Sequence, residues 1–180
     1  MERRIWTIGH GTRPVEEFIG LLTQAGVRRL VDVRSFPGSR RHPQFGRDPL
    51  EAELEAADVE YVWRRDLGGF RKPRSDSPHV ALRNPGFRGY ADYMEGAEFR
   101  EALAWLTSSS VRTPTAIMCA ETVWWRCHRR MISDALLAGG WEVTHIIGPG
   151  MPTSHALHPA ARVDGGRVIY DVGGQAELSV

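Results

Sequence analysis

The stretch that decides the fold of this chain is TAIMCAETVWWRCHRRMISDALLA, residues 115–138. Its first five residues are apolar and typical of a short buried strand, and its second half repeats apolar residues at the spacing of an amphipathic helix. The loop between strand and helix carries a glutamate and two tryptophans, and it is flanked by both cysteines of the chain. We therefore expect a strand–loop–helix unit with polar groups at its centre.

The same unit places reactive side chains at one end of a helix. The strand ends on Cys119, and the helix is expected to begin near Cys127, His128 and Arg129. The N-terminus of a helix attracts anions because its first N–H groups are unpaired and its dipole is positive there. Any chemistry of this protein is expected in this region.

Length and composition bound the class of protein. The chain has 180 residues, of which 42% are hydrophobic, and this is enough for one packed core. We expect a single α/β domain over residues 1–180. No apolar run approaches the roughly 20 residues of a membrane span.

The start of the chain, MERRIWTIGH, has no apolar signal core. The small number of cysteines, two, favours free thiols over a disulfide. A cytoplasmic protein without membrane contact is expected.

The charge of the chain is nearly balanced. A formal net charge of +1 does not favour a general affinity for nucleic acid, although nucleic acid stays possible as a partner. Lys72 is the only lysine, so nearly all the basic residues are arginines. Most of them fit a solvated surface, and some fit planar recognition of phosphate or carboxylate.

Strand and helix patterns alternate along the chain, which predicts an α/β fold in three layers. A mostly parallel sheet of about five strands is expected, with helices on both faces and a late edge strand. The expected strands are residues 5–9, 30–34, 59–63, 115–119 and 142–147, with the edge strand at 167–171. Between 90 and 106 one long helix or two short ones are expected, with Gly96 as the possible break. Residues 68–88 are expected to form a long irregular loop or lid.

Polar residues stand at the end of each predicted strand. In a parallel sheet these ends share one edge, where ligands bind. The residues concerned are His10, Asp32 with Arg34, Arg64 with Arg65, Cys119 with Glu121, and His145.

The cysteines admit several interpretations. Cys119 could be a nucleophile whose pKa is lowered by the helix and nearby arginines, or a buried cysteine that closes an apolar strand. Together with Cys127 and His128 it could bind zinc, but adjacent residues at a helix start point in different directions. A phosphatase-type cradle is disfavoured because bulky tryptophans fill the loop.

The charged and histidine residues at the other strand ends can also be interpreted as either structural or functional. Asp32 and Arg34 fit an ion pair at a strand end. Glu121 with His128 or His10 fits an acid–base pair.

The two tryptophans, Trp124 and Trp125, fit either a core or a surface that stacks on a planar group. His145 lies inside an apolar strand and fits a satisfied core histidine. The remaining histidines have no partner in the sequence pattern, namely His42, His79, His155 and His158.

With these residues assembled, the chain resembles the bacterial and archaeal family known as domain of unknown function 488. The matching motifs run in one order through most of the chain: TIGH (7–10), 14–18, LVDVRSFP (30–37), 39–40, 61, 67–69, 89–91, CAE (119–121), CHR (127–129) and 143–146. Two positions depart from the family pattern. Gly11 stands where a serine is usual, and Trp124 and Trp125 fill a spacer that is typically more polar.

The resemblance implies a compact α/β domain whose matching residues gather at one site. These residues are His10, Asp32, Arg34, Cys119, Glu121, Cys127, His128 and Arg129. The resemblance supplies no reaction.

The leading hypothesis is an enzyme that acts on a small anionic ligand, such as a nucleotide. In this hypothesis Arg34 and Arg129 hold the anion, Cys119 is the nucleophile, and Glu121 or His10 moves protons. One alternative is a non-catalytic module that binds a nucleotide or nucleic acid. The other is a metal-binding protein with Cys119, Cys127 and His128 as ligands. The sequence identifies no cofactor, no substrate and no oligomeric state.

Overall fold

A six-stranded sheet forms the centre of the structure, a computed structural model in which residues 3–150 and 152–173 are described. The strand order is β3-β2-β4-β1-β5-β6, and every pair is parallel except β5 with β6. The predicted parallel sheet is thereby confirmed. The strands are β1 (Arg4–Gly9), β2 (Arg29–Asp32), β3 (Glu60–Trp63), β4 (Thr115–Cys119), β5 (Glu142–Ile146) and β6 (Thr153–Ser154).

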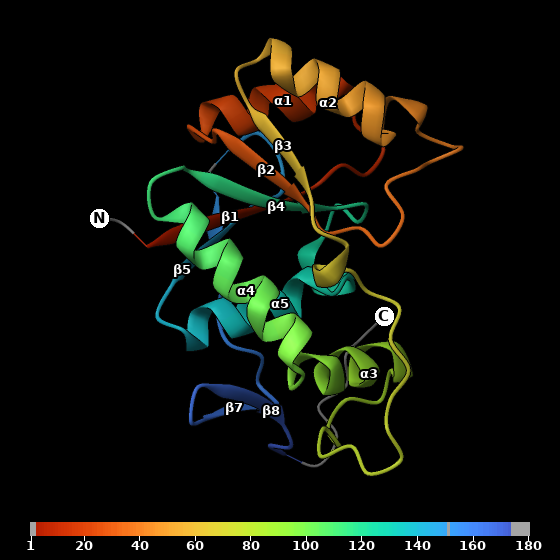
Figure 1. Cartoon of the computed structure of the whole chain (residues 1–180), viewed down its shortest axis with the longest axis vertical. Helices are drawn as coiled ribbons and strands as arrows, with labels where there is room; N and C mark the ends of the chain where they lie inside the picture. Colours follow the sequence, from red (N-terminus) through yellow and green to blue (C-terminus); the bar gives the residue numbers. More distant parts are fainter. Residues whose placement is uncertain (1–2, 151, 174–180) are drawn as a thin grey trace.

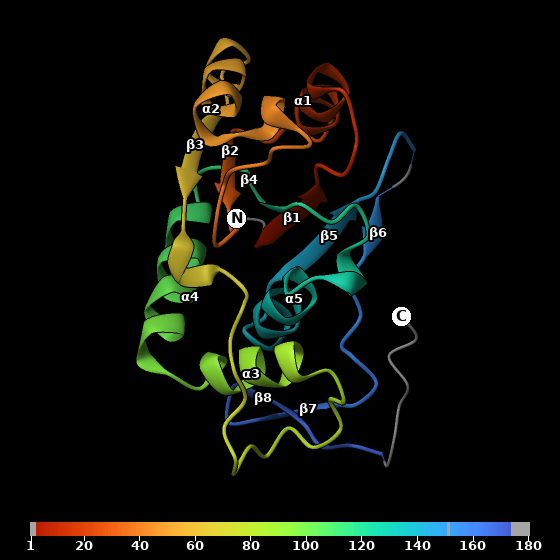
Figure 2. The same cartoon turned by 90° about the vertical axis from the view of Figure 1, so that its right-hand side faces the viewer.

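Helices cover both faces of this sheet, as predicted. Figures 1 and 2 show α1 (Val15–Gln24) and α2 (Arg47–Ala56) on one side of the strands. The other side carries α4 (Ala97–Ser110) and α5 (Arg129–Ala138), with α3 (Pro85–Met94) beyond them. The fold is therefore a three-layer α/β arrangement.

The late strand forms, but it joins a different sheet. β8 (Arg167–Tyr170) pairs antiparallel with β7 (Ala161–Asp164), and the two make a separate hairpin. The hairpin is closed by Gly165 and Gly166, whose φ angles are +56° and +80°. A two-residue turn of this kind requires left-handed backbone at both positions, which glycine adopts freely. The main sheet ends instead on the two-residue strand β6.

The break near Gly96 is confirmed, since α3 and α4 are separate helices that meet there. The irregular segment that was expected over 68–88 is shorter than predicted, because α3 begins at Pro85. Asn84 caps this helix, and its side-chain oxygen accepts hydrogen bonds from the backbone N–H groups of Gly86 and Phe87. An asparagine cap followed by proline is a strong helix start, and it outweighs the poor helix propensity of the residues that follow.

Alternate residues of each strand enter two different cores. Along β4, Ile117 and Cys119 pack with the core under α3, α4 and α5, whereas Ala116 and Met118 pack with the core under α1 and α2. The two-residue period of a strand causes this division. It decides which polar residues can meet, because a side chain on one face cannot reach the other.

None of the helices described in residues 3–150 and 152–173 is both long enough and apolar enough to cross a membrane.

The loop after β4 lies directly on the end of β1, and this close approach predicts an effect of substitution at Gly9. A Cβ atom at Gly9 would lie 1.7 Å from the carbonyl oxygen of Glu121. We expect Gly9→Ala to lower the free energy of unfolding by about 3 kcal/mol, measured by urea denaturation. Gly20→Ala in α1 is the matched control, because a Cβ there meets nothing within 4 Å. It should raise stability by about 0.5–1 kcal/mol, and equal effects of the two changes would contradict the packing described.

Candidate functional site

The predicted site residues do not form one cluster, because the sheet separates them. Gly9 pairs in register with Cys119, so the next residue, His10, turns to the opposite face. Asp32 and Arg34 lie on the same face as His10, under α1 and α2. The thiol group, defined here as Cys119, Cys127, His128 and Arg129, lies on the α5 face.

Arg129 is the centre of the thiol group. It is only 1% exposed, and its Nε–H donates to the Cys119 sulfur at 3.0 Å. Its backbone N–H donates to the Cys127 sulfur at 3.3 Å. Its remaining donors are also engaged, with Nη1 3.2 Å from the Thr7 hydroxyl and Nη2 2.5 Å from the Glu121 carbonyl oxygen. Arg129 therefore holds both sulfurs, Cys119 through its guanidinium and Cys127 through its backbone N–H, and its guanidinium also holds the loop between them.

The two thiols differ in acidity. Burial raises the pKa of Cys119 well above its ordinary value, and the neighbouring Cys127 raises it further. Burial alone would also raise the pKa of Cys127, but its interactions with Cys119 and Arg129 outweigh burial and lower the pKa to about 7. Cys127 also lies at the start of α5, where the helix dipole favours an anion. Cys127 is therefore the more acidic of the two thiols.

His128 fixes the position of the thiol group against the sheet. Its Nε2–H donates to the carbonyl oxygen of Val33 at 3.0 Å, so Nδ1 is left as an acceptor that lies 3.9 Å from the Cys127 sulfur. Gly69 packs on the imidazole, and a Cβ at that glycine would approach Nδ1 to 3.1 Å. Burial lowers the pKa of His128, so the ring is neutral at pH 7.

The described residues do not offer a metal site. No group of three or more His, Cys, Asp or Glu side chains in residues 3–150 and 152–173 is arranged to hold an ion. His128 uses Nε2 on a carbonyl oxygen, and both sulfurs accept hydrogen bonds from Arg129. The geometry gives no support to the metal alternative with Cys119, Cys127 and His128 as ligands.

The second group of predicted residues is built on the buried carboxylate of Asp32. Arg34 donates to both carboxylate oxygens. Its Nε lies 2.9 Å from Oδ1 and 3.1 Å from Oδ2, and its Nη2 lies 2.5 Å from Oδ2. The Tyr61 hydroxyl donates to the same carboxylate at 2.6 Å. The last nitrogen of Arg34, Nη1, donates to the Phe45 carbonyl oxygen at 2.8 Å. This fully paired arrangement is structural.

His10 belongs to this second group and not to the thiols. Its ring stacks on Phe45, with ring centres 4.4 Å apart, and Nδ1 donates to the Gly11 carbonyl oxygen. Burial lowers its pKa to about 4, so it is neutral at pH 7. Phe45 lies on the two-helix face that carries Asp32, so the His10 ring packs on the opposite face of the sheet from the Cys119 thiol.

Neither Arg34 nor Arg129 has its donors turned to solvent. Each guanidinium is buried and engaged within the protein. An anion at the carboxyl edge of the sheet would have to be met by other arginines. The exposed arginines in the loops that follow β2, β3 and β4 are Arg40, Arg41, Arg65, Arg74, Arg83 and Arg126.

The loop between the cysteines supplies the exposed members of the predicted site. Glu121 is exposed, and Trp125 is 41% exposed. Trp124 is half-buried, and its ring stacks on His145 at 4.1 Å with an interplanar angle of 7°. Trp124 therefore covers a histidine, whereas Trp125 and Glu121 face solvent beside the thiol group.

A set of buried polar residues behind the thiol group was not predicted as functional. It comprises Thr7, Asp134 and Tyr170, together with His145, which was predicted to be a satisfied core histidine, and His155, for which the sequence pattern predicted no partner. Thr7 precedes Gly9 by two residues, so the strand period places both on one face of β1. Because Gly9 pairs with Cys119 in register, Thr7 lies on the same face of the sheet as Cys119. The signal for Asp134 is a carboxylate within the apolar stripe of α5.

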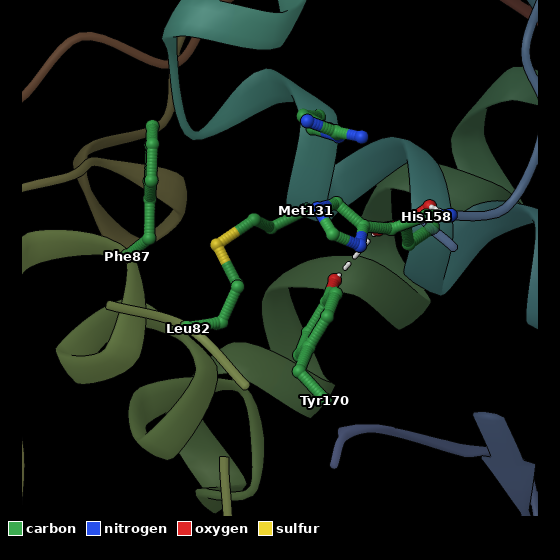
Figure 3. Close-up of a pocket in the computed structure, with 7 residues that line it drawn as sticks. Leu82, Phe87, Met131, His158 and Tyr170 are labelled. Carbon is green, nitrogen blue, oxygen red and sulfur yellow. Dashed lines mark hydrogen bonds between the residues drawn. The ribbon is translucent and has the colours of Figure 1, made fainter. Parts of the chain in front are cut away.

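A small cavity lies on the far side of α5, next to the β7–β8 hairpin (Figure 3). Its free volume is about 10 Å³, room for about one water molecule. Its size rules it out as a site for a substrate. It is lined by Leu82, Phe87, Arg130, Met131, Asp134, His158 and Tyr170.

The fold and this geometry define a three-layer α/β protein with two paired thiols at the carboxyl edge of a parallel sheet. The chain belongs to the family described as domain of unknown function DUF488, whose model matches residues 14–136. The family resemblance expected from the sequence is confirmed. No curated protein and no solved structure matches the chain.

The paired carboxylate of Asp32 predicts a large loss of stability when it is removed. Asp32→Ala leaves the Arg34 guanidinium buried without a counter-charge, and we expect a loss of about 3–5 kcal/mol in urea denaturation. Tyr61→Phe removes one hydrogen bond and should cost about 1–2 kcal/mol. A loss below 1 kcal/mol for Asp32→Ala would show that the ion pair is not buried as described.

Buried neutral histidines predict acid sensitivity. Burial lowers the pKa of His10 and His158 to about 4 and that of His145 to about 3, from an ordinary value of 6.5. Below pH 6.5 the unfolded chain therefore binds protons that the folded protein does not. Stability should fall as the pH drops from 6.5 towards 4, by roughly 1–3 kcal/mol for each histidine.

Urea midpoints at pH 7, 5.5 and 4.5 measure this effect. His10→Gln should make the loss between pH 6.5 and 4 smaller than in the unchanged protein. A midpoint that stays constant over this range would contradict burial of the neutral rings.

Proposed function

We propose that the protein is an enzyme in which the Cys127 thiolate is the nucleophile and the substrate is a small anion. The observation that carries the proposal is the position of Cys127 at the start of α5, in contact with the backbone N–H of Arg129 and beside the Cys119 thiol. A helix N-terminus and an arginine are the features that make a cysteine reactive near neutral pH.

Cys119 has a supporting role in this proposal. Its pKa is raised by burial, so at pH 7 it carries a proton that it can share with the neighbouring thiolate. The sequence favoured Cys119 as the nucleophile, but its position at the end of a buried strand makes it the less acidic of the two thiols. The proposal therefore assigns nucleophilic attack to Cys127 and assigns Cys119 to stabilising the thiolate.

The charge of the surrounding surface favours an anionic substrate. Loops that follow three adjacent strands contribute Arg40 and Arg41, Arg65, and Arg126, all exposed. Arginine is suited to phosphate and carboxylate because its donors form a planar fork. Glu121 is the exposed carboxylate of the same edge, and we propose that it carries the proton of the reaction.

The pH dependence of thiol alkylation tests the nucleophile. With iodoacetamide as the probe and mass spectrometry to locate the label, Cys127 should reach half of its maximal rate near pH 7. Cys119→Ser should leave this midpoint near pH 7, because the serine hydroxyl still donates a hydrogen bond to the thiolate. In Cys127→Ser the remaining thiol should react only well above pH 9, because burial raises its pKa.

The two serine variants are controls for each other, since each removes one sulfur from the same pair. A Cys127 midpoint at or above the free value of about 8.5 would overturn the assignment. If Cys119 is labelled at pH 7 in place of Cys127, the nucleophile is Cys119, at the end of β4.

A second function is favoured by a separate observation, the exposure of aromatic rings at the same edge. Phe36 is 69% exposed, Phe70 is 88% exposed and Trp125 is 41% exposed, and each lies in a loop after one of three adjacent strands. The guanidinium of Arg65 lies 5.8 Å from the Phe36 ring. Aromatic rings among arginines suit a non-catalytic module that binds a nucleotide or single-stranded nucleic acid.

Salt dependence separates this module from the enzyme. A binding module should hold a labelled oligonucleotide with an affinity that falls as salt rises, and it should do so equally well after Cys127→Ser.

A further inference from the structure

We propose that a buried chain of five side chains positions Arg129 against the two thiols, and that it runs from Arg129 through Thr7, His145 and His155 to Asp134. This relay, as we call these five residues, rests on the proposed role of Cys127 as nucleophile. It assigns four residues outside the thiol group to positioning and none of them to contact with the substrate.

Each step of the relay is a short contact. The Arg129 Nη1 lies 3.2 Å from the Thr7 hydroxyl, and that hydroxyl lies 2.7 Å from Nδ1 of His145. Nε2 of His145 lies 3.0 Å from Nδ1 of His155. Nε2 of His155 lies 2.8 Å from Oδ1 of Asp134. The five residues are between 0% and 7% exposed, so water does not offer alternative partners.

The Asp134 end of the relay sets the direction of its hydrogen bonds, and the Arg129 end agrees with that direction. Arg129 can only donate, so the Thr7 oxygen accepts from it, and the Thr7 hydroxyl keeps its proton for Nδ1 of His145. At the other end, the Asp134 carboxylate accepts from Nε2–H of His155, which leaves Nδ1 of His155 as an acceptor. Nε2–H of His145 then donates to that nitrogen. No step places two donors or two acceptors face to face.

Asp134 is fixed as an acceptor by two further partners. Its Oδ1 also accepts from the backbone N–H of His158 at 3.1 Å, and its Oδ2 accepts from the Tyr170 hydroxyl at 2.7 Å. The hydroxyl stays protonated because burial raises the pKa of Tyr170 well above its ordinary value. Figure 3 shows Tyr170 and His158 converging below α5, beside the small cavity.

The relay gives the buried guanidinium a counter-charge without a carboxylate beside the sulfurs. A carboxylate in direct contact with Arg129 would compete with the thiolate for the same donors and would raise the pKa of Cys127. Asp134 is instead connected to Arg129 through the Thr7 hydroxyl and two imidazole rings. It balances the charge of Arg129 from a distance, and the Nε–H and backbone N–H of Arg129 stay available to the two sulfurs. Trp124 stacks over His145 and closes the relay from the solvent side.

Thr7→Val tests the relay, because it removes the hydroxyl with little change of volume. The guanidinium then loses its partner at Nη1, and the Cys127 pKa measured by iodoacetamide alkylation should rise by about one unit, a tenfold loss of thiolate at a pH below both values. Thr7→Ser keeps a hydroxyl and should leave this pKa within 0.3 unit of its original value. Ser110→Ala in α4 removes a buried hydrogen bond far from the thiols and is the control for general destabilisation.

A double-mutant cycle tests whether the effect travels along the relay. His155→Phe removes both ring nitrogens of the link to Asp134 and should raise the Cys127 pKa in the same direction as Thr7→Val. When Thr7→Val is already present, His155→Phe should add less than 0.3 unit, because the connection is already broken. Additive shifts would overturn the relay.

The tautomers of the two histidines give a measurement that does not depend on any variant. Nitrogen-15 NMR of the unchanged protein should show that Nε2 is the donor nitrogen and Nδ1 the acceptor nitrogen in both His145 and His155. An Nδ1–H tautomer at either ring would overturn the relay.

The outcomes separate the relay from the enzyme proposal. An acidic Cys127 that is indifferent to Thr7→Val would refute the relay and leave the nucleophile in place. An ordinary Cys127 pKa with both Nε2–H tautomers present would refute the nucleophile and leave the relay as a purely structural network.

Discussion

The structure depends on one buried cation, the guanidinium of Arg129. Removal of a charge from water costs several kcal/mol unless its donors are all paired, and Arg129 is 1% exposed. Its partners are the Cys119 sulfur, the Thr7 hydroxyl and the Glu121 carbonyl oxygen, so the charge requires β1, β4 and the following loop to meet at one place. The same contacts hold the loop over Gly9 and place Cys127 at the start of α5. The pairing of this guanidinium thus fixes Cys119, and the backbone N–H of the same residue holds the Cys127 sulfur.

The parallel sheet divides the polar residues of its carboxyl edge between two faces. The face under α1 and α2 receives the paired carboxylate of Asp32 and the stacked ring of His10, and both are fully engaged in packing. The face under α5 receives the thiols and the relay. The first group holds the loop that contains Phe45, and the second holds the two thiols. An edge rich in polar residues is therefore not by itself one site.

The relay extends beyond the segment that the family model matches. Arg129 and Asp134 lie within residues 14–136, whereas Thr7, His145 and His155 lie outside them. β1 and β5 flank each other in the sheet, and this pairing sets Thr7 opposite His145 in register. The β5–β6 connection then returns the chain so that His155 reaches both the β5 histidine and α5. The part of the chain outside the match thus completes the surroundings of the thiols.

The layers, the parallel strands, the break at Gly96 and the helix start next to the thiols could be predicted from the sequence, because these features depend on local periodicity and on turn residues. The family motifs were also visible in the sequence. Three features could be learned only from the folded chain: His10 and Cys119 face opposite ways, β8 pairs with β7, and His145 and His155 have partners. Strand pairing and register are set by contacts between distant residues, and a shift of one residue exchanges the faces. The acidity of Cys127 depends on such contacts with Cys119 and Arg129, and no local pattern in the sequence encodes it.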